Sequence, residues 1–198
     1  MMNFLGLDLS LTSTGFYLIR GDEGKKDEYC EICTKPDDFC DDISRSDYIA
    51  HAIIDRIKNE NITFIALEDY FTGKQPQSVI KLATLGTVVR IRLMDAGYAF
   101  MPFVTSQIKK FETGSGVAPK DNMLKSVFKK HGLDTTSNNI ADACAIAHLG
   151  RAYYEWMAGR RDFLAYETEV LKKISKERKP IQPYGIDLTD KKVVMKKK

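Results

Sequence analysis

The stretch FLGLDLSLTSTG, residues 4–15, begins with the alternation of a β-strand and ends in the polar residues of a tight turn. Phe4, Gly6 and Asp8 fall on one face of the expected strand, and the leucines between them fall on the other. The apolar residues 16–20 then resume the pattern, so this stretch predicts the first hairpin of a sheet. Its unusual feature is Asp8, a carboxylate in the middle of an apolar strand.

The rest of the chain alternates between strand and helix patterns. β-Branched and apolar runs predict further strands over residues 29–34, 62–67 and 98–104. Apolar residues at helical spacing predict helices over residues 46–59, 78–96, 105–111, 120–131, 138–157 and 163–179. Ser46 is the expected cap of the first helix, and Thr105 or Ser106 of the third. This order favours an α/β fold, in which helices flank a mixed sheet.

Length and composition fit one intracellular globular domain with at most an appendage. The chain has 198 residues, of which 43% are hydrophobic and 29% are charged, close to the average for globular proteins. No apolar run reaches the roughly 20 residues of a membrane helix, and the N-terminus lacks the basic region of a signal peptide. The cysteines are Cys30, Cys33, Cys40 and Cys144. They are expected to be reduced thiols, so we predict a soluble, cytoplasmic protein.

Charge is distributed unevenly along the chain. Residues 171–198 contain 10 basic and 3 acidic residues, whereas residues 1–170 contain 20 basic and 24 acidic residues. A basic end on a slightly acidic body predicts contact with a polyanion, although a solvated, disordered terminus has the same composition. Nucleic acid is favoured over a membrane surface because this end has few large apolar anchors.

Three acids occupy positions where burial of a carboxylate is costly. Asp8 lies among leucines, Glu68 ends an apolar strand, and Asp142 interrupts the apolar run of residues 140–147. Each needs a cation, a hydrogen-bond network or a metal ion. Each acid taken singly could also end its element at solvent, but the three together favour a site. Nearby lysines and arginines are few, which favours a metal.

Oxygen ligands alone select hard cations, so Mg²⁺ or Mn²⁺ is the expected cofactor. Two such ions held by shared carboxylates can activate water and stabilise the leaving oxygen in phosphodiester hydrolysis. The three acids therefore predict a nuclease. A zinc site at Cys30, Cys33 and Cys40 is an alternative that lacks an evident fourth ligand.

Four motifs in order resemble those of the RuvC Holliday junction resolvases, which belong to the RNase H-like, or retroviral-integrase, superfamily. They are Gly6-Leu7-Asp8-Leu9-Ser10 with Thr14-Gly15, Leu67-Glu68 with Phe71, Thr113-Gly114-Ser115-Gly116 with Lys120, and Asp142-Ala143-x-Ala145-x-Ala147. The resemblance covers about residues 3–157. It implies an RNase H-like nuclease domain over 1–158, which leaves a helical extension over 159–179 and a basic tail over 180–198.

The resemblance also implies roles for residues. The catalytic set would be Asp8, Glu68, Lys120 and Asp142, with Lys120 as a cation near the scissile phosphate. Metal ligands would be the three acids and Asn139, and two ions are expected. The residues expected to contact DNA are Phe71, Lys74, Ser115, Lys120 and Lys125. Phe71 would intrude at the strand-exchange point of a four-way junction, and the helix over 78–96 would build a homodimer.

Two departures from the family pattern stand out. Bacterial members usually place an Asp or His one helical turn before the last acid, where this chain has Asn139. An amide oxygen can bind a metal but carries no charge, so a weaker second metal is expected. The chain also continues past the usual end of the family. Both features suggest a phage-encoded branch, which would act in the host cytoplasm.

The predicted function is metal-dependent, structure-selective cleavage of Holliday junctions and other branched DNA. An ATPase or sugar kinase of the same superfold is opposed by the short chain and by the lack of a second matching hairpin. The loop 113–116 also lacks the Lys-Ser/Thr ending of a P-loop. A non-enzymatic protein that binds branched DNA is a third possibility, kept open by Asn139.

Overall fold

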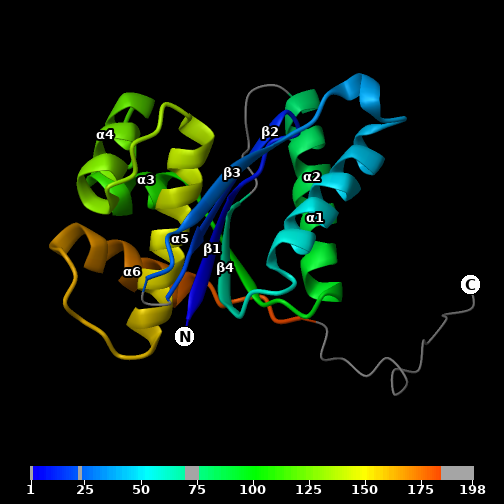
Figure 1. Ribbon diagram of the computed structural model, residues 1–198. Coiled ribbons are helices and arrows are strands. Elements are labelled where there is room, and N and C mark those ends of the chain that lie inside the picture. The colour runs from blue at the N-terminus through cyan, green and yellow to red at the C-terminus, as the bar shows by residue number, and fades with distance from the viewer. Residues whose placement is uncertain (1, 22–23, 70–75, 184–198) are drawn as a thin grey trace, which may run out of the picture.

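The computed structural model describes residues 2–21, 24–69 and 76–183. The described strands form a mixed five-stranded sheet in the order β3-β2-β1-β4-β5, shown in Figure 1. These strands are β1 (Asn3–Asp8), β2 (Ser13–Ile19), β3 (Glu28–Cys33), β4 (Ile62–Glu68) and β5 (Phe100–Phe103). β1, β2 and β3 pair antiparallel, and β4 and β5 run parallel to β1. The predicted mixed sheet is confirmed.

Helices cover both faces of the sheet. The helical elements are η1 (Pro36–Asp38), α1 (Asp42–Ile57), α2 (Pro76–Asp95), α3 (Thr105–Thr113), α4 (Lys120–His131), α5 (Asn138–Met157) and α6 (Ala165–Glu177). Figure 1 shows α1 and α2 on one face, with α5 and its neighbours α3, α4 and α6 on the other. None of the helices in the described ranges is long and apolar enough to cross a membrane.

The alternation of β1 separates two cores, as the sequence predicts. Leu5 and Leu7 pack in the cluster beneath α1 and α2. Phe4 belongs to the other cluster, which is centred on α5 and includes the buried Cys144 and Tyr153. Asp8 therefore ends β1 on the α5 side, because a residue two or four places from Phe4 shares its face.

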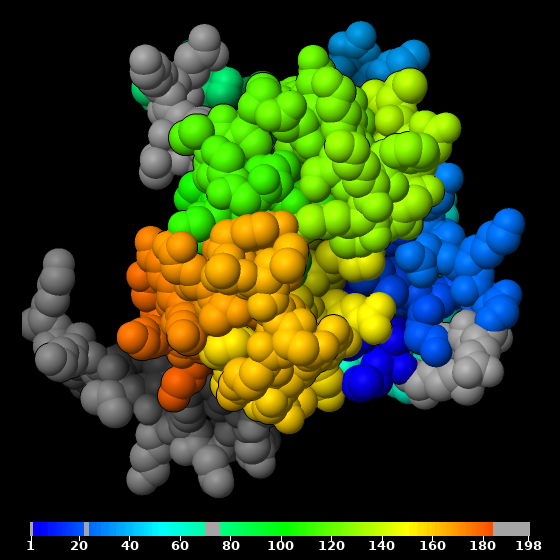
Figure 2. All heavy atoms as spheres, turned by 90° about the vertical axis from the view of Figure 1, so that its left-hand side faces the viewer, coloured from blue at the N-terminus to red at the C-terminus, as the bar shows by residue number. Residues whose placement is uncertain are grey.

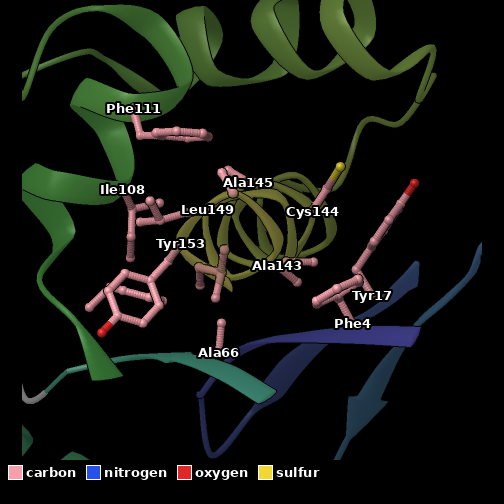
Figure 3. Close-up of a cluster of buried hydrophobic side chains, with 14 of the residues drawn as sticks. Phe4, Tyr17, Ala66, Ile108, Phe111, Ala143, Cys144, Ala145, Leu149 and Tyr153 are labelled. Atoms are coloured by element: carbon pink, nitrogen blue, oxygen red, sulfur yellow. The ribbon is translucent and has the colours of Figure 1, made fainter. Parts of the chain in front are cut away.

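Packing between α5 and the sheet depends on small residues. A Cβ atom on Gly6 would lie 2.1 Å from the backbone oxygen of Ala143, and a Cβ atom on Gly15 would lie 2.1 Å from that of Asn139. Figure 3 shows Ala143 on the side of α5 that faces the strands. The backbone of α5 therefore approaches β1 and β2 as closely as the chain permits.

Two predicted boundaries are wrong. α1 begins at Asp42 and is capped by Asp41, which forms a reciprocal capping box with Ser44. Ser46, the expected cap, is buried inside the helix and donates to the backbone oxygen of Asp42. α6 ends at Glu177, before the expected end at 179, because Arg178 adopts an extended conformation.

The segment after α6 is attached to the edge of the sheet. Arg178 donates from Nη1 to Asp69 Oδ2 at 2.6 Å and to the backbone oxygen of Pro102 at 3.0 Å. Ile181 then exchanges two backbone hydrogen bonds with Phe100 of β5, at 2.8 and 3.0 Å. Asp69 also binds Arg90 of α2 at 3.1 Å, so it joins elements from both faces. The position of α6 is therefore tied to the edge of the sheet.

The close approach at Gly6 makes a testable prediction. Gly6→Ala forces a Cβ atom against the Ala143 backbone, so it should lower the free energy of unfolding by about 2–3 kcal/mol. The matched control is Gly132→Asn, because a Cβ atom there meets nothing within 4 Å and asparagine tolerates the left-handed cap. Urea unfolding of both variants measures the difference, and equal losses would contradict the packing described for α5.

Candidate active site

Three carboxylates from three elements line one small pocket. Asp8 ends β1 and Glu68 ends β4, two parallel neighbours whose register pairs Leu7 with Leu67. Asp142 comes from the first turns of α5, which packs on β1. The pocket has a volume of about 30 Å³. Its lining residues are Asp8, Glu68, Thr105, Ile108, Lys109, Asp142 and Ile146. The prediction that the three acids meet is thus supported by the geometry.

Burial and mutual repulsion disfavour the charged forms of two of these acids. The pKa of Asp8 is raised well above its usual value, mainly by burial and then by the charges of Glu68 and Asp142. Contact with the Glu68 side chain raises the pKa of Asp8 further. Burial, followed by repulsion from Glu68, raises the pKa of Asp142 to about 6. The pocket therefore has unbalanced negative charge at neutral pH.

Two lysines reduce this excess of negative charge. Lys120, the first residue of α4, lowers the pKa of both Asp8 and Asp142 by its positive charge. Lys109 of α3 lines the pocket and lowers the pKa of Asp142. Lys120 is exposed and does not itself line the pocket. The structure thus places the predicted cation beside the carboxylates without pairing it to one of them.

Thr105 is a pocket residue that the sequence predicts only as a possible helix cap. The cap position of α3 is instead Val104. The Thr105 hydroxyl instead donates to Glu68 Oε1 at 2.5 Å and so orients that carboxylate. The only local sequence signal is that Thr105 lies two residues after the end of β5, which lies beside the end of β4. The contact itself spans 37 residues and has no local pattern.

Asn139 lies one turn before Asp142, as its spacing predicts, but it does not line the pocket. Its side-chain amide donates to Glu31 Oε1 of β3 at 3.3 Å. Ser137, the cap of α5, donates to the same carboxylate oxygen. Asn139 as a metal ligand stays a prediction, and its amide is directed to β3 instead.

The expected DNA-contacting residues lie in different places. Ser115 is exposed in the loop between α3 and α4, where its backbone amide donates to Thr113 Oγ1. Lys125 of α4 lines a separate groove of about 360 Å³ together with Lys129 and residues of α3 and α6. Phe71 and Lys74 lie outside the described residues.

Within residues 2–21, 24–69 and 76–183, no three His, Cys, Asp or Glu side chains are already arranged to hold a metal ion. This holds for the pocket carboxylates as well as for the cysteines. Cys33 and Cys40 are exposed, and their sulfur atoms lie near the hydroxyls of Ser13 and Ser44. The alternative zinc site at the cysteines therefore gains no support from the geometry.

The model of one protein family, crossover junction endodeoxyribonuclease RuvC, matches residues 4–149. The chain belongs to the RuvC family. Its relatives include the crossover junction endodeoxyribonuclease RuvC of Sulfurovum sp., 31% identical over 158 residues, which cover 76% of this chain and 96% of that protein. The same enzyme of Campylobacter jejuni is 27% identical over 150 residues, covering 74% and 92% of the two chains.

Solved RuvC structures share the fold. The chain superposes on Thermus thermophilus RuvC in complex with Holliday junction substrate with a TM-score of 0.67 and 23% identity. The superposition covers 80% of this chain and 97% of that one. The RuvC relatives named here are bacterial proteins, so they give no support to the expected phage-like branch. α6 lies beyond the region that the family model matches.

The raised pKa of Asp142 predicts that ionising this side chain lowers the stability of the metal-free protein. Its native pKa of about 6 exceeds that of an unfolded aspartate, so the native state is favoured below about pH 4 and loses this stability as the pH rises through 6. In EDTA at pH 7, Asp142→Asn should therefore raise the melting temperature by about 3–6 °C.

Melting curves at pH 7 and pH 5 test this expectation. The gain should shrink at pH 5, where Asp142 is already protonated, and the exposed Asp134→Asn should show no gain at either pH. A lower melting temperature of Asp142→Asn at pH 7 would contradict the crowding of negative charge.

Proposed function

We propose that the protein is a metal-dependent endonuclease that cuts four-way junctions and related branched DNA at the pocket of Asp8, Glu68 and Asp142. One observation is the main support: three acids from separate elements line one pocket in a chain of the RuvC family. Asp8 and Asp142 also have raised pKa values because of burial and mutual repulsion. Such crowding costs stability and is characteristic of a site built for function.

The donor set fits Mg²⁺ or Mn²⁺. The pocket offers carboxylate oxygens and a threonine hydroxyl, with no sulfur or imidazole ligand among its lining residues. When bound, one or two such ions would activate water and stabilise charge on the phosphate. Asp8, Glu68 and Asp142 would hold them, and binding would favour the ionised form of Asp8, whose pKa is raised without a metal ion. Asn139 would join this set only by turning away from Glu31.

Other residues of the pocket would orient the carboxylates, limit their hydration and attract the phosphate. Thr105 fixes Glu68 through its hydrogen bond. Ile108 and Ile146 form the apolar part of the lining, which limits hydration and raises the energy of bare carboxylates. Lys109 and Lys120 would attract the scissile phosphate, since both lie close enough to change the pKa of Asp142.

DNA binding would extend beyond the pocket. We propose that Phe71 stacks at the strand-exchange point and that Lys74, Ser115, Lys120 and Lys125 contact phosphates. Phe71 and Lys74 come three and six residues after Glu68 in the sequence, and their proposed roles rest on the resemblance to the RuvC family. A phage-encoded origin and a cytoplasmic location also remain our predictions, and the former rests on Asn139 and the extension.

A homodimer on α2 is part of the proposal. Ile80 and Ile91 of α2 are 65% and 43% exposed, and their spacing of eleven residues places both on one side of the helix. We propose that a second copy of the chain covers this side of α2. The resulting dimer would carry two active sites, one for each cut strand of a symmetric junction. The alternative of ATPase or kinase chemistry has less support, because the pocket of the three acids, about 30 Å³, is far smaller than a nucleotide requires.

Removing each carboxylate tests the proposed site. Asp8→Asn, Glu68→Gln and Asp142→Asn should each slow cleavage of a labelled four-way junction roughly 100-fold or more in Mg²⁺. Junction affinity should be retained, because the substitutions keep the shape of each side chain. Asp134→Asn is the control with full activity expected. Retained cleavage in one variant would remove that residue from the site, and a wild-type protein that binds but never cuts would establish the non-enzymatic alternative.

A further inference from the structure

We propose that α6 presents a lysine face that binds the phosphate backbone of a DNA arm beside the pocket. This lysine face consists of Lys172, Lys173 and Lys176. The inference rests on the proposed function and adds to it a DNA-contacting surface in the part of the chain beyond the family match at residues 4–149.

The three lysines share one side of the helix. All three are exposed, whereas Val170, Leu171 and Ile174 form the buried side of α6. Positions 172, 173 and 176 are separated by one and three residues, which groups them on one side. Figure 2 shows α6, in orange, exposed on the face of the molecule that also presents α4. A single DNA backbone could therefore run along several of these ammonium groups.

The positive charge of the lysine face is not balanced within the described part of the chain, where none of its lysines forms a salt bridge. Two acids of α6 are already engaged: Glu167 binds Lys130 at 3.0 Å, and Glu169 binds Lys110 at 2.5 Å. Glu177 is the remaining acid of the helix. The face therefore has a net positive charge that phosphates can neutralise.

Two attachments hold α6 near the pocket. Glu169 binds Lys110 of α3, which directly follows the pocket-lining Lys109. At the other end, Arg178 binds Asp69, which directly follows the pocket-lining Glu68. Each attachment thus involves the sequence neighbour of a residue that lines the pocket. The lysine face lies between these two points of the helix, so its position relative to the carboxylates is fixed.

The attachment at Arg178 is one part of a small network at the edge of the sheet. Asp69 and Arg178 are both half-buried, with side-chain exposures of 19% and 28%, and Asp69 also binds Arg90. The backbone pairing of Ile181 with Phe100 then fixes the direction of the chain after the helix. A phosphate-binding surface gains affinity when its charges are held in place before DNA arrives.

The test compares two triple variants of the full chain. The first carries Lys172→Gln, Lys173→Gln and Lys176→Gln. The matched control carries Lys25→Gln, Lys26→Gln and Lys58→Gln, which remove the same charge. These control lysines follow β2 or precede β4, at the end of the sheet opposite the ends of β1 and β4 that carry Asp8 and Glu68. Binding to a labelled four-way junction is measured in EDTA over a series of NaCl concentrations.

The α6 variant should bind several-fold more weakly at about 0.15 M salt, because counterion release is lost. Its plot of log affinity against log salt should become less steep, by about 0.9 in slope for each phosphate contact removed. Binding to linear duplex should weaken as well, since phosphate contacts carry no sequence or junction information. The control variant should keep the wild-type slope. Equal slopes for the α6 variant and the wild type would overturn the inference.

Cleavage separates this inference from the proposed function. At saturating protein in Mg²⁺, the α6 variant should cut the junction at the wild-type single-turnover rate, because its lysines do not touch the reacting atoms. A wild-type protein that fails to cut would overturn the proposed function while the salt series still tests the lysine face as a DNA-binding surface. Loss of slope in both triple variants would indicate a general charge effect and would also overturn the inference.

Discussion

The close approach of α5 to β1 and β2 is the constraint on which the rest of the structure depends. Gly6 and Gly15 leave no room for a side chain between the strands and the helix backbone. The distance between α5 and the sheet is therefore fixed, and Asp142 lies in one pocket with the acids that end β1 and β4. A bulkier contact at either glycine would lift the helix and separate its carboxylate from the two on the sheet.

Electrostatics follow from this packing. The same contact that brings three carboxylates together also removes water from them. The pKa values of Asp8 and Asp142 are therefore raised above those of exposed aspartates. Lys109, Lys120 and the Thr105 hydroxyl lessen the cost without cancelling it. A cation-binding site needs this unbalanced charge, because a carboxylate already paired with an arginine has little left to offer a metal ion.

Much of this arrangement is predictable from the sequence, because strand faces and helix stripes follow from simple periods. The alternation of residues 4–15 assigns Asp8 to its face, and small residues around Asp142 indicate a buried helix. Contacts between distant segments follow no such period. The hydroxyl of Thr105 binds Glu68, and the amide of Asn139 binds Glu31 across 108 residues, and neither contact follows from local spacing. The early end of α6 likewise depends on Asp69, a partner 109 residues away.

Asp8, Glu68 and Asp142 are proposed to form one cation site, and crystals soaked in MnCl₂ test this most directly. Anomalous diffraction near the manganese absorption edge reports the position of the ion without reference to activity. We predict an anomalous peak within coordination distance of oxygens from at least two of the three carboxylates, and its loss in crystals of Asp8→Asn. A pocket without a peak at saturating Mn²⁺, or a peak only at other side chains, would contradict the account.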